Sequence, residues 1–174
     1  MAVVREKAKE VVTSMDIELA VANHFNPRMN LIVPNVFWGL GFKHELDVAV
    51  MTPSGYLTEI EIKVSRQDLK RDSLKLHGHV SQRIRRHFFA IPQSLKELCL
   101  EVARPEWGIL VFGGGSLETI RHAKINKQAI PLSATESQKL YELAAMRIWT
   151  LKRALCDRIN KQKLNTPPET EDRP

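Results

Sequence analysis

Residues 45–72, ELDVAVMTPSGYLTEIEIKVSRQDLKRD, contain the most informative secondary-structure pattern of this 174-residue chain. Apolar and polar residues alternate over residues 44–51, which predicts a half-buried strand. Residues 52–55 (TPSG) have proline and glycine at the second and fourth positions of a type I turn, so the chain should reverse there. Residues 56–64 alternate again, and the two strands should therefore form a hairpin.

Caps, chain breakers and periodicity predict the elements on either side of this hairpin. Ser65 and Asp68 form an S-x-x-D capping box, which predicts a basic helix to about residue 76. Upstream, Ser14 should cap a helix over residues 14–25. Further expectations are an edge strand with Pro34 at residues 31–38, strands at about residues 86–91, 107–112 and 117–125, a helix capped by Ser94, a turn at Gly113-Gly114-Gly115, and an amphipathic helix over residues 135–163.

This order of elements predicts an α/β fold, a three-layer sandwich with a central mixed sheet covered by helices on both faces. The length suits a single domain at residues 1–163, followed by a polar tail at residues 164–174 that we expect to be disordered. The apolar stripe of the last helix fits either the core of the domain or a homodimer interface.

The composition argues against several classes of protein. The sequence has no apolar run long enough to span a bilayer, so we expect no membrane partner. The N-terminal residues, MAVVREKAKEVV, are charged where a signal peptide needs its apolar core, so we do not expect export. Cys99 and Cys156 are isolated thiols, which argues against a disulfide framework and structural zinc and fits a cytoplasmic location.

The positive charge of the chain is concentrated in one stretch. The 26 Lys and Arg residues exceed the 20 Asp and Glu residues, and the net charge is +6. Residues 63–86 contain eight bases and two acids, so this stretch by itself also has a net charge of +6. Such a local excess is typical of proteins that bind a polyanion. We expect DNA to contact Arg66, Lys70, Arg71, Lys75, Gln82, Arg83, Arg85 and Arg86.

Alternation in the second strand of the hairpin places Glu59, Glu61 and Lys63 on one face, and Asp47 in the first strand can join them. Burying such charges is costly unless a divalent cation compensates them, and carboxylate oxygens are ligands that Mg²⁺ or Mn²⁺ prefers. The site suits phosphodiester hydrolysis. Asp47 and Glu61 would bind the ion, the carbonyl of Ile62 would be a further ligand, and Lys63 would orient or deprotonate the attacking water.

These residues also resemble a family signature. Asp47, followed after the hairpin by residues 61–63 (EIK), resembles the D…(D/E)-x-K motif of the PD-(D/E)XK nuclease superfamily, although Leu46 stands where the motif often has proline. The string at residues 45–72, followed by RRHFFAIP at residues 85–92, is similar to small phage and bacterial members of the MmcB-like DNA-repair branch. The resemblance covers about residues 14–125.

The resemblance implies a restriction-endonuclease-like fold with an αβββαβ core, metal binding by Asp47 and Glu61, and a catalytic role for Lys63. Many members also place a glutamate of the first core helix at the metal, and Glu18 is the candidate here. We therefore expect a metal-dependent DNA endonuclease or nickase in DNA repair, recombination or phage DNA metabolism. Two alternatives remain open: a non-catalytic DNA-binding module on the same fold, and an RNA-directed nuclease.

Several residues have a structural explanation beside the functional one. Glu45 either hydrogen-bonds to the metal ligands or lies in water at the strand end, and Glu18 fits a solvated first-turn acid as well as a ligand. Ser65 and Asp68 should mainly cap their helix and only secondarily support the site. Residues 77–79 (HGH) lack a third ligand nearby, so we do not expect them to bind a metal. The tryptophans should be core or interface anchors: Trp38, Trp107 and Trp149.

Overall fold

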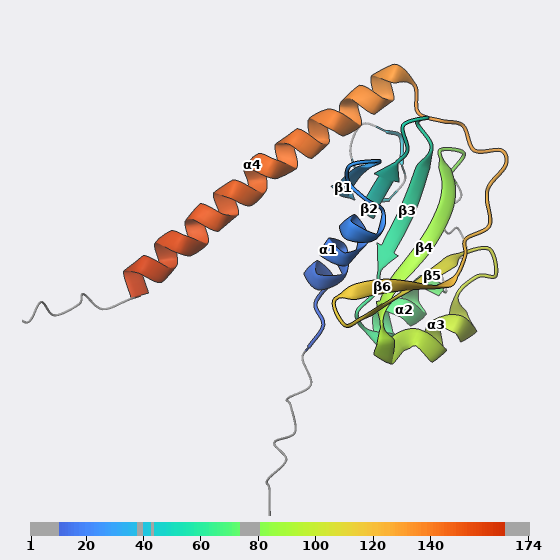
Figure 1. The fold of residues 1–174 in the computed structure, drawn as a ribbon, viewed down its shortest axis with the longest axis horizontal. Helices are drawn as coiled ribbons and strands as arrows, with labels where there is room; N and C mark the ends of the chain where they lie inside the picture. Colours follow the sequence, from blue (N-terminus) through green and yellow to red (C-terminus); the bar gives the residue numbers. More distant parts are fainter. Residues whose placement is uncertain (1–10, 38–39, 43, 74–80, 166–174) are drawn as a thin grey trace, which may run out of the picture.

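The elements of the computed structural model follow the order expected from the sequence. The structure describes residues 11–37, 40–42, 44–73 and 81–165. Along these residues a long C-terminal helix follows an α/β body (Figure 1). The elements are α1 (Ser14–His24), β1 (Leu31–Val36), β2 (Leu46–Met51), β3 (Leu57–Ile62), α2 (Arg66–Ser73), β4 (Ile84–Pro92), the 3₁₀ turn η1 (Gln93–Leu95), α3 (Lys96–Val102), β5 (Gly108–Gly113), β6 (Ser116–Arg121) and α4 (Ala134–Asn165).

Within the described residues, six strands form one mixed sheet in the order β1-β2-β3-β4-β5-β6. β1, β2 and β3 pair antiparallel, as do β5 and β6, whereas β4 runs parallel to both β3 and β5. Parallel neighbours need a crossover connection, which α2 and α3 provide. Pro34 lies in β1 at the edge of the sheet, where a missing N–H is tolerated, and the predicted edge position is confirmed.

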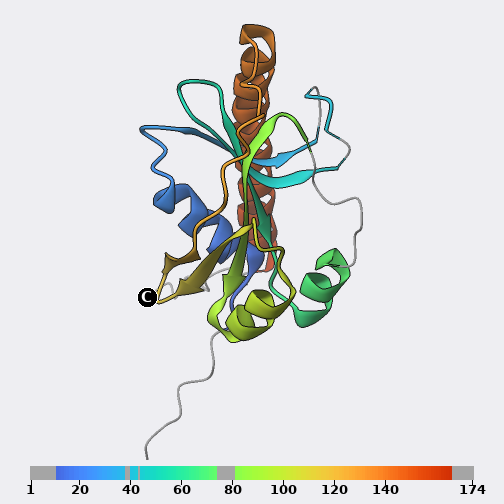
Figure 2. The ribbon, with the colours of Figure 1, turned by 90° about the vertical axis from the view of Figure 1, so that its right-hand side faces the viewer.

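Helices cover both faces of this sheet, which confirms the predicted α/β sandwich. In Figure 2, α1 (blue) and α2 (green) lie on opposite sides of the sheet. We call the first side the α1 face. Here Ile17 and Val21 of α1 pack against Val48, Ile60 and Phe88 of three neighbouring strands.

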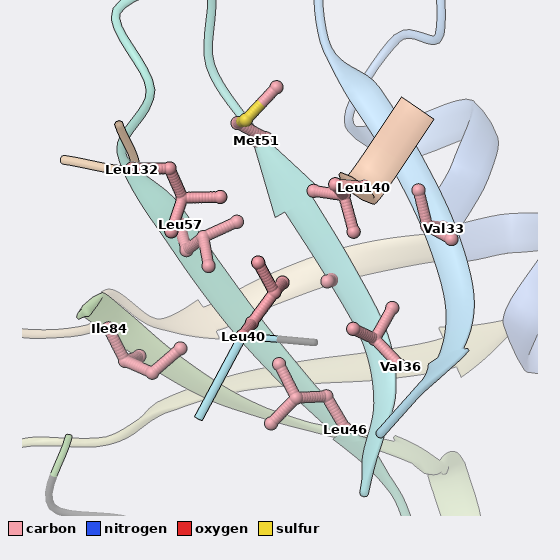
Figure 3. Packing of buried hydrophobic residues seen from close by; sticks show 10 residues of the cluster. Val33, Val36, Leu40, Leu46, Met51, Leu57, Ile84, Leu132 and Leu140 are labelled. Atoms are coloured by element: carbon pink, nitrogen blue, oxygen red, sulfur yellow. The ribbon is translucent and has the colours of Figure 1, made fainter. Parts of the chain in front are cut away.

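The opposite face has two apolar clusters among the described residues. The first packs Leu132 and Leu140 against β1, β2 and β3 (Figure 3). The second packs Leu69 of α2 and Cys99 of α3 against Phe89 and other residues of β4 and β5. These two clusters and the α1 face together hold the sheet that positions the candidate site.

α4 contributes to the core through its first turns and then leaves the body of the molecule (Figure 1). Leu140 is fully buried, and Leu143 packs partly against the same cluster. Beyond these turns, Ile148, Leu151 and Leu155 are each more than half exposed. The structure therefore supports a core role for the start of the predicted stripe and not for its continuation. Among the described residues, no helix combines the length and apolarity needed to cross a bilayer.

Two predicted helix caps are wrong. Thr13, not Ser14, caps α1, because its hydroxyl oxygen accepts the N–H of Asp16 while the Asp16 carboxylate accepts the N–H of Thr13. Ser94 does not cap α3, because it lies inside η1 and the N-cap position is taken by Leu95 without a side-chain hydrogen bond.

The predicted turn after β2 is confirmed, whereas β6 ends at Arg121 and not at residue 125, and the C-terminal helix is longer than predicted. The turn after β2 closes through the Gly55 N–H, which donates to the Thr52 carbonyl at 2.9 Å, and Gly55 has a φ of 80° that favours glycine. α4 continues to Asn165, so the first two residues of the expected disordered tail are helical. The rest of that tail lies outside the described residues.

Candidate metal centre

Asp47 and Glu61 lie side by side at the end of the paired part of β2 and β3. The register pairs Val48 with Ile60, and its continuation by one residue places Asp47 beside Glu61. The Oδ2 atom of Asp47 accepts a hydrogen bond from the Ile62 N–H at 2.8 Å, which holds the carboxylate against β3. The structure thus brings together the two carboxylates that the sequence pattern predicts as metal ligands.

Glu61 and its neighbours are desolvated by the fold. Because Ile60 faces α1, the alternation along β3 turns Glu59 and Glu61 to the opposite face. Among the described residues these two are the buried charged side chains, with 0 % and 5 % exposure. The Nζ atom of Lys63 donates to Glu61 Oε2 at 2.6 Å, and the Lys63 N–H donates to the Ala90 carbonyl of β4. The ammonium of Lys63 is therefore held beside the Glu61 carboxylate.

This environment changes the protonation of Glu61. Desolvation raises the pKa of its carboxyl, the negative charges of Asp47 and Glu59 raise it further, and the Lys63 ammonium lowers it, which brings the pKa to about 7. A carboxyl with this pKa is partly protonated at neutral pH. A divalent cation beside it would favour the ionised form, so the donor set fits a bound metal ion.

Glu18 approaches this group from α1. Its side chain is half-buried, and desolvation followed by the negative charge of Asp47 raises the pKa of its carboxyl. Asp47 thus acts electrostatically on both Glu18 and Glu61. Glu18 is thus close enough to Asp47 for their charges to interact, and its role as a metal ligand stays a prediction.

Two histidines flank Glu59 and were not predicted as site residues from the sequence. The Nε2 atom of His44 lies 2.6 Å from Glu59 Oε1, and the Nδ1 atom of His87 lies 3.0 Å from Glu59 Oε2. The His87 ring stacks on Trp107 with the ring centroids 5.4 Å apart. His87 reaches Glu59 through the parallel pairing of β3 with β4, a contact between strands that no local pattern reveals. His44 lies three residues before Asp47 in the sequence, and this short spacing could have marked it as a candidate site residue.

The donor atoms form two sets that share Glu61. Asp47 and Glu61 are hard oxygen donors of the kind that Mg²⁺ prefers, and the carbonyl of Ile62 stays a predicted further ligand. His44, Glu59 and Glu61 form a mixed set, in which one donor atom from each lies within 4.8 Å of the others. The site can therefore offer both oxygen-only and mixed nitrogen and oxygen coordination.

Glu45, Ser65 and Asp68, which were predicted to support the metal ligands, belong to neither set of donor atoms. Glu45 is exposed just before β2. Ser65 Oγ accepts the Asp68 N–H at 3.1 Å, which is the helix-capping hydrogen bond predicted for α2, and it donates to Asp68 Oδ2 at the same distance. Arg71 donates to the other oxygen of Asp68. Ser65 and Asp68 therefore hold the start of the helix that follows Lys63.

The basic residues of α2 adjoin the site through the chain itself. α2 begins three residues after Lys63, and Arg66, Lys70 and Arg71 are exposed on it. Arg71 also pairs with Asp68 in a surface ion pair. Lys75 and the histidines of residues 77–79 lie outside the described residues. The exposed cations of α2 are thus the described basic residues nearest to Lys63 along the chain.

The basic residues at the start of β4 lie elsewhere. β4 is parallel to β3, and the register pairs Ile84 with Leu57 and Phe89 with Glu61. These two pairs are four positions apart along β3, which corresponds to about 13 Å. Gln82, Arg83 and Arg85 therefore belong to the end of the sheet away from Glu61.

The contacts that Arg83, Arg85 and Arg86 form also separate these arginines from the exposed cations of α2. Arg83 forms an ion pair with Glu136 of α4 at 2.6 Å, and the guanidinium of Arg85 lies 3.8 Å from the centroid of the Tyr56 ring. Arg86 lines a hollow with His24 next to α1. The described basic residues of this stretch therefore lie in two groups, one on α2 and one at the start of β4, because the α2 crossover carries the chain to the other end of the sheet. Contact of either group with DNA stays a prediction.

Comparison with known proteins supports the fold. No protein-family model and no curated protein matches the chain. Among solved structures, the chain is similar to the SPO1766 protein of unknown function from Silicibacter pomeroyi, with 24 % sequence identity and a TM-score of 0.60. The match covers 86 % of this chain and 95 % of that chain, so the two share the fold over most of their length.

Proposed function

We propose that the protein is a metal-dependent nuclease that hydrolyses DNA phosphodiester bonds. The observation that supports this most directly is the arrangement of Asp47, Glu61 and Lys63. Two carboxylates lie side by side on neighbouring strands, and an ammonium lies 2.6 Å from one of them. Carboxylate oxygens suit Mg²⁺ or Mn²⁺, and a positive charge beside them suits a phosphate whose negative charge increases during the reaction.

Each residue of the site has a distinct role in this proposal. Asp47 and Glu61 would bind the ion, with the Ile62 carbonyl and Glu18 as further ligands. When bound, a divalent ion lowers the pKa of a coordinated water and neutralises charge on the phosphate. The Ile62 N–H keeps Asp47 in position. Lys63, whose side chain is 13 % exposed, would orient or deprotonate the attacking water.

The substrate class follows from the charges that adjoin the site. Arg66, Lys70 and Arg71 are exposed on the helix that starts three residues after Lys63, and cations in this position suit a nucleic-acid backbone. Backbone contacts of this kind do not distinguish DNA from RNA, and the preference for DNA comes from the resemblance to DNA-repair nucleases. An assay with both nucleic acids therefore belongs to the test.

The test is a cleavage assay with labelled single-stranded, nicked, flapped, branched and duplex DNA and with the matching RNA, in Mg²⁺, in Mn²⁺ and in EDTA. We expect cleavage that needs the metal, and a loss of about 100-fold or more in Asp47→Asn and Glu61→Gln. Lys63→Ala should lower turnover by about 100-fold while metal affinity changes less. Glu118→Gln, an exposed carboxylate of β6, is the matched control and should retain activity.

Two results would overturn the proposal. Full activity in folded Asp47→Asn and Glu61→Gln would show that the reaction occurs elsewhere. Tight, salt-dependent DNA binding without cleavage of any substrate would indicate a non-catalytic binding module. Cleavage of RNA in preference to DNA would support metal-dependent phosphodiester hydrolysis and show that the substrate is RNA and not DNA.

A further inference from the structure

We infer that His44, Glu59 and Glu61 form a second cation site, selective for a transition metal such as Zn²⁺ and adjacent to the predicted Mg²⁺ site. One donor atom from each side chain lies within 4.8 Å of the other two. Donor atoms around a tetrahedral Zn²⁺ with bonds of about 2.0–2.1 Å are about 3.4 Å apart. His44 Nε2 and Glu59 Oε1 are 2.6 Å apart, so small side-chain rotations that move these two atoms apart and bring the three donors to this spacing would place them around one ion.

The burial of Glu59 supports this site. Its side chain is fully buried, and it projects from β3 on the same side as Glu61, which is itself 5 % exposed. Two neighbouring carboxylates are costly to remove from water, and both are buried here. A divalent cation between them would add two positive charges where the fold has excluded solvent.

The chemistry of the donors favours a transition metal. Imidazole nitrogen binds Zn²⁺ and other late first-row ions better than Mg²⁺ or Ca²⁺, which prefer oxygen-only sets. The His44 side chain is 30 % exposed, so an ion can reach the site from solvent. Three protein ligands leave a position for water or substrate, as in catalytic rather than structural zinc sites.

His87 and Trp107 would orient this site without binding the ion. His87 Nδ1 lies 3.0 Å from Glu59 Oε2, while the other carboxylate oxygen, Oε1, lies 2.6 Å from His44. The His87 ring is held by stacking on Trp107. A group that fixes one oxygen of a carboxylate directs the other, which is the usual role of residues behind metal ligands. His87 is therefore a positioning residue.

This inference goes beyond the proposed function and does not depend on it, because metal binding is measured without nucleic acid. The two predicted cation sites share Glu61 and differ in their other ligands. Asp47→Asn should impair the Mg²⁺ site and keep Zn²⁺ affinity within about 3-fold of the unmodified protein. His44→Ala should weaken Zn²⁺ binding and keep Mg²⁺ affinity within about 3-fold. The two variants thus separate the two sites.

The experiment is calorimetric titration of untagged, EDTA-treated protein with Zn²⁺, together with Co²⁺ absorption spectra that report coordination by the protein. We expect one transition-metal ion per chain, and a loss of affinity of at least about 10-fold in His44→Ala and in Glu59→Gln. Circular dichroism checks that each variant is folded, and His44→Gln replaces His44→Ala if the alanine variant unfolds. His122→Ala, an exposed histidine after β6, is the matched control.

Unchanged Zn²⁺ affinity in a folded His44 variant would overturn the inference. So would loss of binding in a His77→Ala/His79→Ala double variant while His44→Ala still binds, because the ion would then belong to the H-x-H motif. Zn²⁺ binding as described without any cleavage would refute the proposed nuclease and support this site. Cleavage by the protein, together with unaltered Zn²⁺ affinity in the His44 variants, would support the proposed nuclease and refute the second cation site.

Discussion

Replacing Glu61 by glutamine should make the metal-free protein less sensitive to rising pH. The pKa of Glu61 is about 7 in the folded protein against an ordinary value of 4.5. A carboxyl whose pKa is raised by folding binds its proton more tightly in the folded state than in the unfolded state. Its contribution to stability is therefore fully present below about pH 4.5 and is lost as the pH rises through about 7.

The size of this effect follows from the two pKa values. The difference between about 7 and 4.5 corresponds to about 3 kcal/mol in the free energy of unfolding. For a chain of this length, that is a change of about 10 °C in the melting temperature. Because Glu61 is 5 % exposed, screening by solvent reduces the value little.

The assay is urea unfolding in EDTA at several pH values between 4.5 and 8. The unmodified protein should lose stability over this interval, and Glu61→Gln should lose about 3 kcal/mol less. Glu118→Gln, an exposed carboxylate, should follow the unmodified protein. Mg²⁺ or Zn²⁺ at pH 8 should restore stability to the unmodified protein and have little effect on Glu61→Gln. Equal pH slopes in Glu61→Gln and the unmodified protein would show that folding does not raise the pKa of the Glu61 carboxyl.

Three further predictions concern the surface and α4. Replacing both Arg66 and Lys70 by alanine should lower the slope of log affinity for DNA against log salt by about 2, and fluorescence anisotropy at several salt concentrations measures it. Arg83→Ala should cost about 1 kcal/mol in urea unfolding through loss of its partly exposed pair with Glu136, and a drop in that salt slope would contradict its structural role. Leu140→Ala, at a fully buried position, should lower the free energy of unfolding by about 2–5 kcal/mol. Leu155→Ala, at a position 56 % exposed, should change it by less than about 0.5 kcal/mol. Similar losses in the two variants would mean that another surface covers the end of α4.

Local sequence patterns predicted well where the interactions are themselves local. The alternation of β3 places Glu59 and Glu61 on one face through the geometry of a single strand. The Ser65–Asp68 box and the turn at Gly55 each depend on residues within four positions of one another. The cap of α1 was misplaced by one residue because Thr13 and Ser14 are both suitable caps, and the position of Asp16 relative to Thr13 decides between them.

The basic run shows where chain order misleads. Residues 63–86 carry a net charge of +6 in one stretch of sequence, but the fold divides the described bases of this stretch between α2 and the start of β4. A parallel strand after a crossover starts at the same end of the sheet as its partner, so β4 begins beside Leu57 and not beside Glu61. The ion pair of Arg83 with Glu136 and the packing of Arg85 on Tyr56 then use these side chains within the body of the protein.

The order of the elements, the faces of the hairpin strands and the neighbouring positions of Asp47 on β2 and Glu61 on β3, with Lys63 just after β3, could be read from the sequence, because these depend on periodicity and short-range geometry. Tertiary structure alone decided that His87 meets Glu59, that Glu61 is desolvated enough to hold a proton near neutral pH, and that the end of α4 stays exposed. Each of these depends on segments far apart in the chain, since burial and electrostatic environment arise when strands pair and helices pack.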